Sequence, residues 1–239
     1  MLVLGFETAT PAVSVALHDG ERVLSAAAAV DARRHAELLA PMIAKVMADA
    51  GVARGDLGAV AVGVGPGPYT GLRVGVVTAR VLGSILGLPV YGVCSLDVIA
   101  ASAGSGREFV VATDARRKEV YWARYDADDC RVAGPAVGPA SSIPEATELP
   151  VAGTGGQLYP EAFGEVIGPA YPDAGTLCGL VARSLAASSA LPSLAAPSFA
   201  APSSAARLSS LPPLLAAEPL YLRRPDAREP GPPKRVTPS

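Results

Sequence analysis

Two acidic residues and two hydroxyls stand where buried strands are predicted to end. Glu7, Thr8 and Thr10 follow the apolar run 2–6, and Asp114 follows the run 108–113. Carboxylate and hydroxyl oxygens are ligands that Mg²⁺ and bound phosphates use, so these four residues are candidates for a metal–nucleotide site. The alternative is that both acids only lie in solvated turns. No lysine or histidine supports a catalytic role for them.

A loop rich in glycine and proline, 63–70, precedes a predicted helix at 71–87. Such a loop either presents backbone N–H groups to an anion at the helix N-terminus or only makes a tight corner. It is not a P-loop, because no Gly-Lys-Ser/Thr follows, and no acidic residue completes a dinucleotide fingerprint. Both interpretations stay open, and Thr70 is the expected N-cap of the helix.

The histidines and nucleophiles lack the spacing of a catalytic or metal site. His18 and His35 are the only histidines, and no second histidine lies four residues after either one. Ser14, Ser95 and Cys94 have no histidine base at a motif spacing. We therefore predict no catalytic residue and no metal ligand, and we expect His35 to make a contact at the start of a helix.

The elements that would carry these residues follow an α/β pattern. The first half predicts, in order, strands at 2–6, 13–17 and 22–30, a helix at 35–50, a strand at 59–64, a helix at 71–87, a strand at 89–93 and a helix at 96–102. Strands joined by short turns form an antiparallel meander, and strands joined by helices pair in parallel. The first half therefore predicts a mixed sheet.

The second half echoes this order more loosely, with strands at 108–113, 119–125 and 131–137 before a helix at 176–187. We expect an N-terminal lobe at 1–104 and a C-terminal lobe at 105–226, each a mixed sheet with helices. Within the second lobe, the stretch 188–213 is rich in Ala, Ser and Pro and is predicted to be a disordered insertion. Residues 227–239 are predicted to form a flexible tail.

Composition limits the classes of function. Half of the 239 residues are hydrophobic, which is enough for a sizeable core. The net charge of −2 gives no overall footprint for nucleic acid. The three cysteines share no metal or redox spacing, which indicates a reduced, cytosolic protein. No apolar run is long enough to cross a membrane.

Small residues occupy every fourth position of the helix predicted at 71–87, namely Gly71, Gly75, Ala79 and Gly83. Such a row forms a shallow groove into which another helix can pack. Each glycine costs about 1 kcal/mol in a helix, so a close contact should offset it. The helix at 35–50 has an unusually wide apolar stripe. We predict that the two helices form a partner-binding surface. The alternative is that they pack only on their own sheet and on each other.

Several motifs resemble, in order, the TsaB (YeaZ) family. They are Phe6-Glu-Thr-Ala-Thr, the helix that begins at His35, Gly65-Pro-Gly-Pro-Tyr-Thr-Gly-Leu-Arg-Val-Gly, Gly92-Val-Cys-Ser-Leu, Asp114-Ala-Arg-Arg-Lys-Glu-Val-Tyr-Trp-Ala and Pro219-Leu-Tyr-Leu-Arg-Arg. The resemblance implies two actin-like, RNase-H-like lobes of the nucleotide-handling (ASKHA) class. It also implies a non-catalytic subunit of the bacterial machinery that places threonylcarbamoyl on adenosine 37 of ANN-decoding tRNAs.

The resemblance further implies the partners. They are a metal-binding, catalytic TsaD-type subunit, a TsaE-type ATPase and a second copy of this chain, with tRNA met only through the complex, in the cytoplasm and without a membrane. The implied interface comprises His35, Leu38, Leu39, Met42, Ile43, Val46, Gly67, Tyr69, Thr70, Gly71, Arg73, Gly75, Ala79 and Gly83.

Two departures from the family pattern concern cofactors. Glu7 stands where the family usually has Asp, and Pro68-Tyr69 replaces the usual Ser-Phe. We therefore expect no cofactor bound by this chain alone, while ATP or ADP remains compatible with the assembled complex. Other functions stay open: a stand-alone glycoprotease-like peptidase, an ATP-dependent small-molecule kinase, or a tRNA-binding module, against which the net charge argues.

Overall fold

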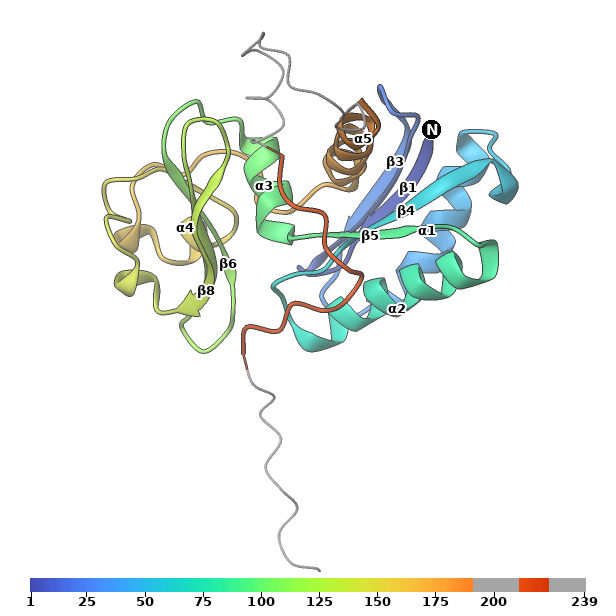
Figure 1. Ribbon diagram of the computed structural model, residues 1–239. Helices are drawn as coiled ribbons and strands as arrows, with labels where there is room; N and C mark the ends of the chain where they lie inside the picture. The colour runs from blue at the N-terminus through green and yellow to red at the C-terminus, as the bar shows by residue number, and fades with distance from the viewer. Residues whose placement is uncertain (191–210, 224–239) are drawn as a thin grey trace, which may run out of the picture.

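Two mixed β-sheets with their helices make up the chain (Figure 1). The computed structural model describes residues 1–190 and 211–223. The first sheet has five strands in the order β3-β2-β1-β4-β5, and the second has four in the order β8-β7-β6-β9. Both sheets combine parallel and antiparallel pairs, so the prediction of an α/β chain with two mixed sheets is confirmed.

The first sheet is built around β1, which pairs antiparallel with β2 and parallel with β4. Its strands are β1 (Leu2–Glu7), β2 (Ala12–His18), β3 (Val23–Val30), β4 (Leu57–Gly63) and β5 (Val90–Val93). The first three strands form the predicted meander, because short turns leave the chain no room for a crossover. β4 and β5 are parallel neighbours joined by a helix.

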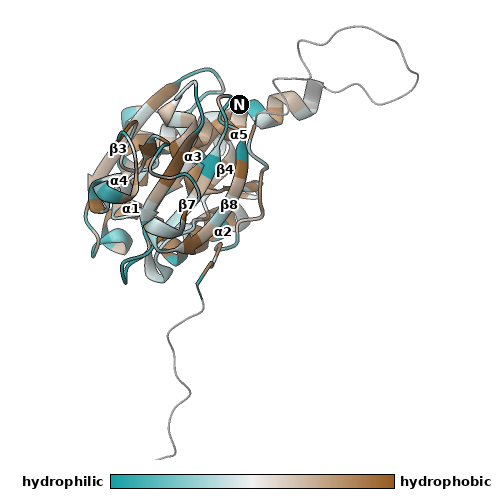
Figure 2. Ribbon diagram, turned by 90° about the vertical axis from the view of Figure 1, so that its left-hand side faces the viewer, coloured by the Kyte–Doolittle hydropathy of each residue, from teal (hydrophilic) through white to brown (hydrophobic). Residues whose placement is uncertain are grey.

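Residues of β1, β2 and β4 point alternately to two buried faces of the first sheet. Leu4 and Phe6 belong to a core with residues of α1 (His35–Asp49) and α2 (Tyr69–Leu86). Val3 belongs to a second core with α5 (Ala174–Ala190). Helices on both faces explain why these strands read as continuous apolar runs. Figure 2 shows brown, hydrophobic colouring along such strands and teal colouring at many turns.

The second sheet is smaller and meets the first through α3 (Ser95–Ala103). Its strands are β6 (Phe109–Asp114), β7 (Val120–Tyr125), β8 (Arg131–Gly138) and β9 (Val151–Ala152). Leu96 and Ile99 of α3 share one core with Phe109 and Val111 of β6. The remaining short elements are η1 (Arg54–Asp56), η2 (Ala140–Ser142), α4 (Gly155–Leu158) and η3 (Pro160–Ala162). The α3 helix is therefore the packing element between the two sheets.

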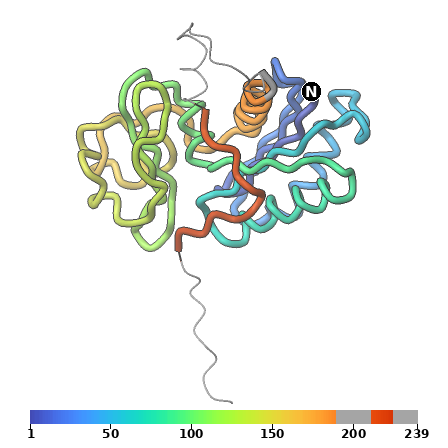
Figure 3. Tube along the Cα trace, viewed as in Figure 1, coloured from blue at the N-terminus to red at the C-terminus, as the bar shows by residue number. Residues whose placement is uncertain are grey.

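The predicted second lobe, 105–226, does not pack as one unit. The α5 helix, which lies within that range, packs on β1 and β2 of the first sheet. After it, residues 211–223 run along the first sheet, where Leu215 pairs with Gly92 and the Leu220 N–H donates to the Val64 carbonyl at 2.8 Å. Figure 3 shows this red segment crossing the molecule between the two sheets. Hence the C-terminal part of the chain ties the sheets together.

Most element ends lie within two or three residues of their predicted positions, with informative differences. The α2 helix begins at Tyr69, with Pro68 as N-cap and no capping side chain, so the prediction of Thr70 as N-cap is wrong. Pro41 lies within α1, which continues to Asp49.

Most of the predicted insertion, 188–213, and all of the predicted tail, 227–239, lie outside the described residues. Among the helices that the structure describes, none is long and apolar enough to cross a membrane.

Candidate functional site

Glu7 ends β1 and is fully buried beneath the glycine loop. Its Oε1 accepts hydrogen bonds from the backbone N–H groups of Thr8 (2.9 Å) and Ala9 (2.7 Å). Its Oε2 accepts the Ser95 hydroxyl at 2.7 Å, and the Ser95 oxygen accepts the N–H of Gly65 at 3.1 Å. The carboxylate thus holds the loop in place. Glu7 as a ligand of a metal–nucleotide site stays a prediction, and the structure shows its carboxyl group fully buried.

The burial of Glu7 gives a pH prediction. Burial raises the pKa of the Glu7 carboxyl above its ordinary value of about 4.5, although the hydrogen bonds from Ser95, Ala9 and Thr8 act in the opposite direction. The folded chain then keeps the Glu7 proton at pH values where the unfolded chain loses it. The stability contributed by this group is present below pH about 4.5 and falls as the pH rises through the folded pKa.

We therefore expect the wild-type chain to lose unfolding free energy relative to Glu7→Gln as the pH rises from about 4.5 towards neutrality. Glutamine keeps the size of the side chain and removes this titration. Urea unfolding of both chains at a series of pH values measures the difference. A wild-type chain that gains stability relative to the variant as the pH rises would contradict the assignment.

The other residues of the first turn are buried or bonded within the chain. The Thr8 hydroxyl donates to the Gly71 carbonyl at 2.8 Å, and the Thr10 oxygen accepts the Ala12 N–H at 3.3 Å. His35 Nε2 donates to the Thr10 carbonyl at 2.7 Å. The prediction of a contact for His35 at the start of a helix is confirmed. Its burial, at 9 % exposure, leaves little of it for an interface.

Asp114 ends β6 and orders a basic turn. Its Oδ1 accepts the Arg116 N–H at 2.7 Å, and its Oδ2 lies 3.2 Å from Arg116 Nη1. Arg116, Arg117 and Lys118 all have positive φ angles, and the acid supports this unusual run. Within residues 1–190 and 211–223, no group of three or more His, Cys, Asp or Glu side chains could hold a metal ion.

The structure nevertheless brings the two turns to one place. A hollow of about 220 Å³ is lined by Thr8, Thr10, Thr70 and Arg116, without Glu7 or Asp114. A neighbouring hollow of about 350 Å³ is lined by Tyr69, Tyr121, Tyr221, Arg116, Arg117 and Arg223. These surfaces offer hydroxyl, aromatic and guanidinium groups, which can contact an anion but contain no nucleophile paired with a base.

The small-residue row of α2 faces the chain's own first sheet. Gly71, Gly75, Ala79 and Gly83 are all buried. A Cβ at Gly75 would collide with Thr8 Oγ1 and lie 3.5 Å from Val62 Cγ2, and one at Gly71 would collide with the Thr8 carbonyl. The prediction of an open groove for a partner's helix is therefore wrong, because the groove is filled from within. The same holds for Gly67, where Ala9 occupies the space.

The large apolar residues of α2 point the other way. Val77, Val81 and Ile85 are 55, 49 and 75 % exposed, and Tyr69 is 47 % exposed. Positions 77, 81 and 85 lie two residues, or about 200°, from the small-residue row. Sequence reasoning did not identify these three residues as a surface. Small residues at spacing four signal close packing on that side, which leaves the larger residues for solvent.

Aromatic contacts extend this surface at the start of α2. The Arg73 guanidinium lies over the Tyr69 ring, 4.4 Å from its centroid, and Tyr69 stacks on Tyr221 with centroids 5.2 Å apart. Tyr69, Thr70 and Arg73 are exposed. We call Tyr69, Arg73, Val77, Val81 and Ile85 the α2 outer face. These residues are spaced four apart and so form one continuous row.

The predicted interface residues of α1 also divide into buried core residues and partly exposed residues. Leu39 is 2 % exposed and Val46 is fully buried, so both belong to the core. Leu38, Met42 and Ile43 are partly buried and pack against that core. The earlier expectation that Leu39 is a surface residue is wrong. Only the partly exposed residues of α1 remain available beside α2.

Comparisons with known proteins identify the family of this chain. The family model described as TsaD, tRNA N6-adenosine threonylcarbamoyltransferase, matches residues 26–153. TsaB of Escherichia coli, a tRNA threonylcarbamoyladenosine biosynthesis protein, is 37 % identical over 133 residues, which cover 54 % of this chain and 57 % of that protein. The structure of YeaZ from Pseudomonas aeruginosa superposes with a TM-score of 0.69 at 32 % identity over 77 % of this chain and 92 % of that one. The chain belongs to the TsaB (YeaZ) family.

Two further relatives extend the match along the chain. An uncharacterized protein of Mycobacterium leprae is 43 % identical over 232 residues, or 95 % of this chain and 56 % of that protein. A second structure from P. aeruginosa, described as similar to peptidase YeaZ, has a TM-score of 0.71 at 29 % identity and covers 93 % of this chain and 99 % of that one. The TsaB-family match therefore includes both sheets. The matched region spans only about half of the M. leprae and E. coli proteins.

Proposed function

We propose that this chain is a non-catalytic subunit of the bacterial complex that forms N6-threonylcarbamoyladenosine at position 37 of ANN-decoding tRNAs. It acts by binding a TsaD-type catalytic subunit in the cytoplasm. The E. coli relative is a tRNA threonylcarbamoyladenosine biosynthesis protein, which supports the assignment to this pathway. The surface of the chain supports the proposed role within the complex.

The α2 outer face is the observation that carries this role. Val77, Val81 and Ile85 of this helix are exposed to solvent, beside the exposed Tyr69. They form an apolar row that association with a partner would bury. Its polar member Arg73 and the neighbouring Thr70 lie at one end of the row, as expected at the rim of an interface. We assign this row, with Leu38, Met42 and Ile43 of α1, as the partner surface for a TsaD-type subunit or for a second copy of the chain.

The chemistry of the described residues supports a role without catalysis. The thiol of Cys94 is buried, and burial raises its pKa to about 12, which disfavours the thiolate that a nucleophile needs. Burial also raises the pKa of the Cys178 thiol. Ser95 is committed to Glu7 and Gly65. These features weigh against the stand-alone peptidase.

The same proposal covers the nucleotide. We expect no nucleotide to bind this chain alone, because the side-chain oxygens of Glu7 and Thr8 already form hydrogen bonds within the chain. The assembled complex also contains a TsaE-type ATPase. There, the hollow beside Arg116 would bind ATP or ADP only if a partner subunit supplied further ligand groups. The turns after β1 and β6 line one hollow, an arrangement that supports the proposal of two actin-like lobes.

Reconstitution tests the proposal. We expect the chain alone, incubated with ATP, threonine, bicarbonate and tRNA, or with ATP and candidate small-molecule or peptide substrates, to give no turnover. We expect it to raise tRNA threonylcarbamoylation strongly when the TsaD-type subunit, the TsaE-type ATPase and a source of the activated threonylcarbamoyl group are present. Mass spectrometry of the digested tRNA is the readout. Hydrolysis or phosphorylation by the chain alone would favour the peptidase or the kinase.

A further inference from the structure

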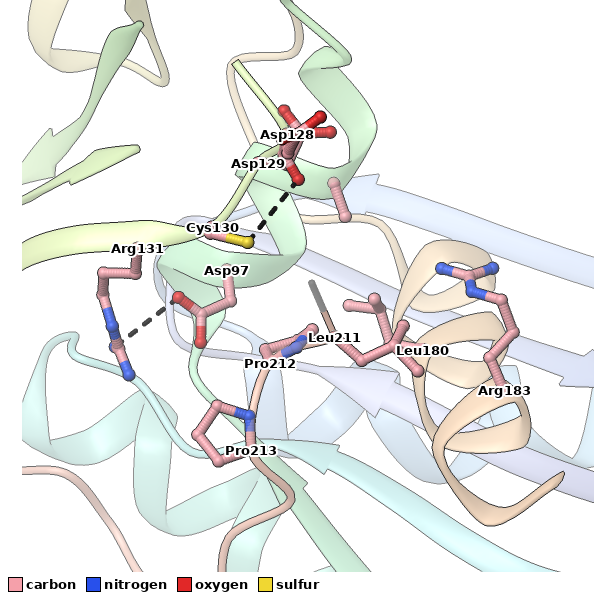
Figure 4. Close-up of a pocket in the computed structure, with 11 residues that line it drawn as sticks. Asp97, Asp128, Asp129, Cys130, Arg131, Leu180, Arg183, Leu211, Pro212 and Pro213 are labelled. Carbon is pink, nitrogen blue, oxygen red and sulfur yellow. Dashed lines mark hydrogen bonds and ion pairs between the residues drawn. The ribbon is translucent and has the colours of Figure 1, made fainter. Parts of the chain in front are cut away.

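The hollow of about 350 Å³ beside the start of α2 has charged groups of one sign on its walls. Among the described residues that line it, Arg116, Arg117 and Arg223 are basic and none is acidic. A hollow of equal volume lies where α3, α5 and the turn between β7 and β8 meet, and there aspartates and arginines share the walls (Figure 4). The excess of guanidinium groups therefore distinguishes the hollow beside α2.

The three arginines come from two segments that contact each other. Arg223 Nη1 donates to the Ala115 carbonyl at 2.9 Å, and Arg223 Nη2 forms an ion pair with Glu119. These contacts fix the Arg223 guanidinium at the base of the turn that carries Arg116 and Arg117. Figure 3 shows the end of the red segment between the second sheet and α2. The guanidinium groups therefore converge on one hollow.

Tyrosine rings form another wall of the same hollow. Tyr221 precedes Arg223 by two residues and stacks on Tyr69 of α2, with ring centroids 5.2 Å apart. Both rings are also exposed, and Tyr121 of β7 lines the hollow from the second sheet. Tyr69 belongs to the α2 outer face as well. The hollow thus borders the surface that we assign to a catalytic partner.

The arginines keep hydrogen-bond donors for a ligand. The Arg116 side chain is 67 % exposed although its Nη1 meets Asp114, and Arg117 is exposed on the same turn. A guanidinium has five N–H donors, so one ion pair leaves donors for a second acceptor. Both residues have positive φ angles, which are unfavourable for residues with a side chain and are found most often at functional sites.

Guanidinium groups beside tyrosine rings favour one class of ligand. Arginine binds phosphate oxygens through paired N–H groups, and tyrosine rings stack on unpaired bases of any sequence. A base in a duplex is already stacked and paired, so it does not offer its face to a ring. The volume of about 350 Å³ is at the lower end of the range for ligand pockets, which suits one nucleotide unit.

We propose that this hollow binds an unpaired nucleotide of single-stranded RNA, with the base stacked on Tyr221 and the flanking phosphates held by Arg116, Arg117 and Arg223. The choice of RNA over DNA rests on the proposed function. The chain itself then contacts the RNA, beside the catalytic partner. A net charge of −2 over the whole chain keeps this contact weak, because only the local cluster attracts phosphate.

Fluorescence polarisation of a labelled oligouridylate with the isolated full chain tests the site. Duplex RNA of the same length, ADP and inorganic tripolyphosphate serve as unlabelled competitors. We expect the oligouridylate to bind and each competitor to be at least about tenfold weaker, because none offers both an unpaired base and a chain of phosphodiesters. The logarithm of the affinity should fall with the logarithm of the salt concentration by about 0.7 for each phosphate neutralised.

Two pairs of variants separate stacking from charge. Tyr221→Ala should weaken the oligouridylate by about fivefold or more, whereas Tyr221→Phe keeps the ring and should bind as the wild-type chain does. Arg117→Asn should lower the salt slope by about 0.7, and asparagine tolerates the left-handed backbone there. Arg54→Asn is its control, because Arg54 is exposed and precedes β4, whereas the hollow lies beyond the other end of that strand.

Several results would overturn the proposal: no binding of the oligouridylate by the wild-type chain, equal binding of the duplex, ADP or tripolyphosphate, or an unchanged affinity in a folded Tyr221→Ala chain. If Tyr221→Ala does not fold, the salt slope of Arg117→Asn decides. A reconstituted complex that modifies tRNA, while the isolated chain binds no oligouridylate, would overturn this inference alone. Oligouridylate binding by a chain that forms no complex with a TsaD-type subunit would support the hollow and contradict the proposed function.

Discussion

Gly75→Arg is expected to unfold the isolated chain. A side chain at Gly75 must enter the space of Thr8 Oγ1, which donates to the Gly71 carbonyl, and its Cβ already lies in contact with Val62 of β4. An arginine there adds a buried charge without a partner to severe overpacking, so we expect a loss of more than about 4 kcal/mol. Even Gly75→Ala should cost about 1–3 kcal/mol from overpacking, partly offset by about 1 kcal/mol of helix propensity.

Ser84→Arg is the matched control for Gly75→Arg. Ser84 is exposed on the same helix, so the substitution should change the unfolding free energy by less than about 0.5 kcal/mol. Urea unfolding followed by circular dichroism compares the chains. A folded Gly75→Arg chain with wild-type stability would show that α2 does not pack on the first sheet as described.

Val81→Arg is expected to abolish association with the TsaD-type subunit while leaving the chain folded. Val81 is 49 % exposed and lies between Val77 and Ile85 on the α2 outer face, so the substitution makes no change in the core. An unpaired charge buried at an interface costs about 2–5 kcal/mol, which corresponds to a loss of affinity of at least about 30-fold. The melting temperature should change by no more than a few degrees, as for other surface substitutions.

Val132→Arg controls for the added charge and the lost valine. Val132 lies on β8 of the second sheet and is 53 % exposed, so it matches Val81 in type and exposure but lies outside the α2 outer face. Its association should equal that of the wild-type chain. If both variants associate normally, the partner surface is not on α2; if both fail, the effect comes from charge and not from position.

Pattern and turn chemistry were sufficient for most of the fold. The three-strand meander, the crossover helices and the two mixed sheets follow from alternation within strands and from the lengths of the connections. Sequence could not place α5, because its apolar residues fit either sheet, and only the close approach of Cys178 to Gly5 settles which one it meets.

The candidate site was harder to predict for a physical reason. Glycine at every fourth position of α2 signals close packing, but the spacing is the same whether the neighbour is a partner or the chain's own sheet. Only the three-dimensional position of Thr8 distinguishes the two cases. Likewise Glu7 has the sequence context of a ligand, and only its burial against Thr8, Ala9 and Ser95 reveals a structural role.

The affinity between the wild-type chain and the TsaD-type subunit of the same organism tests the central claim most directly. Sedimentation velocity over a range of concentrations, with each protein also run alone, separates the mixed complex from self-association. We predict a discrete mixed complex with a dissociation constant in the micromolar range or tighter, lost in Val81→Arg and kept in Val132→Arg. Absence of any mixed complex, at concentrations where both proteins are folded, would contradict the account.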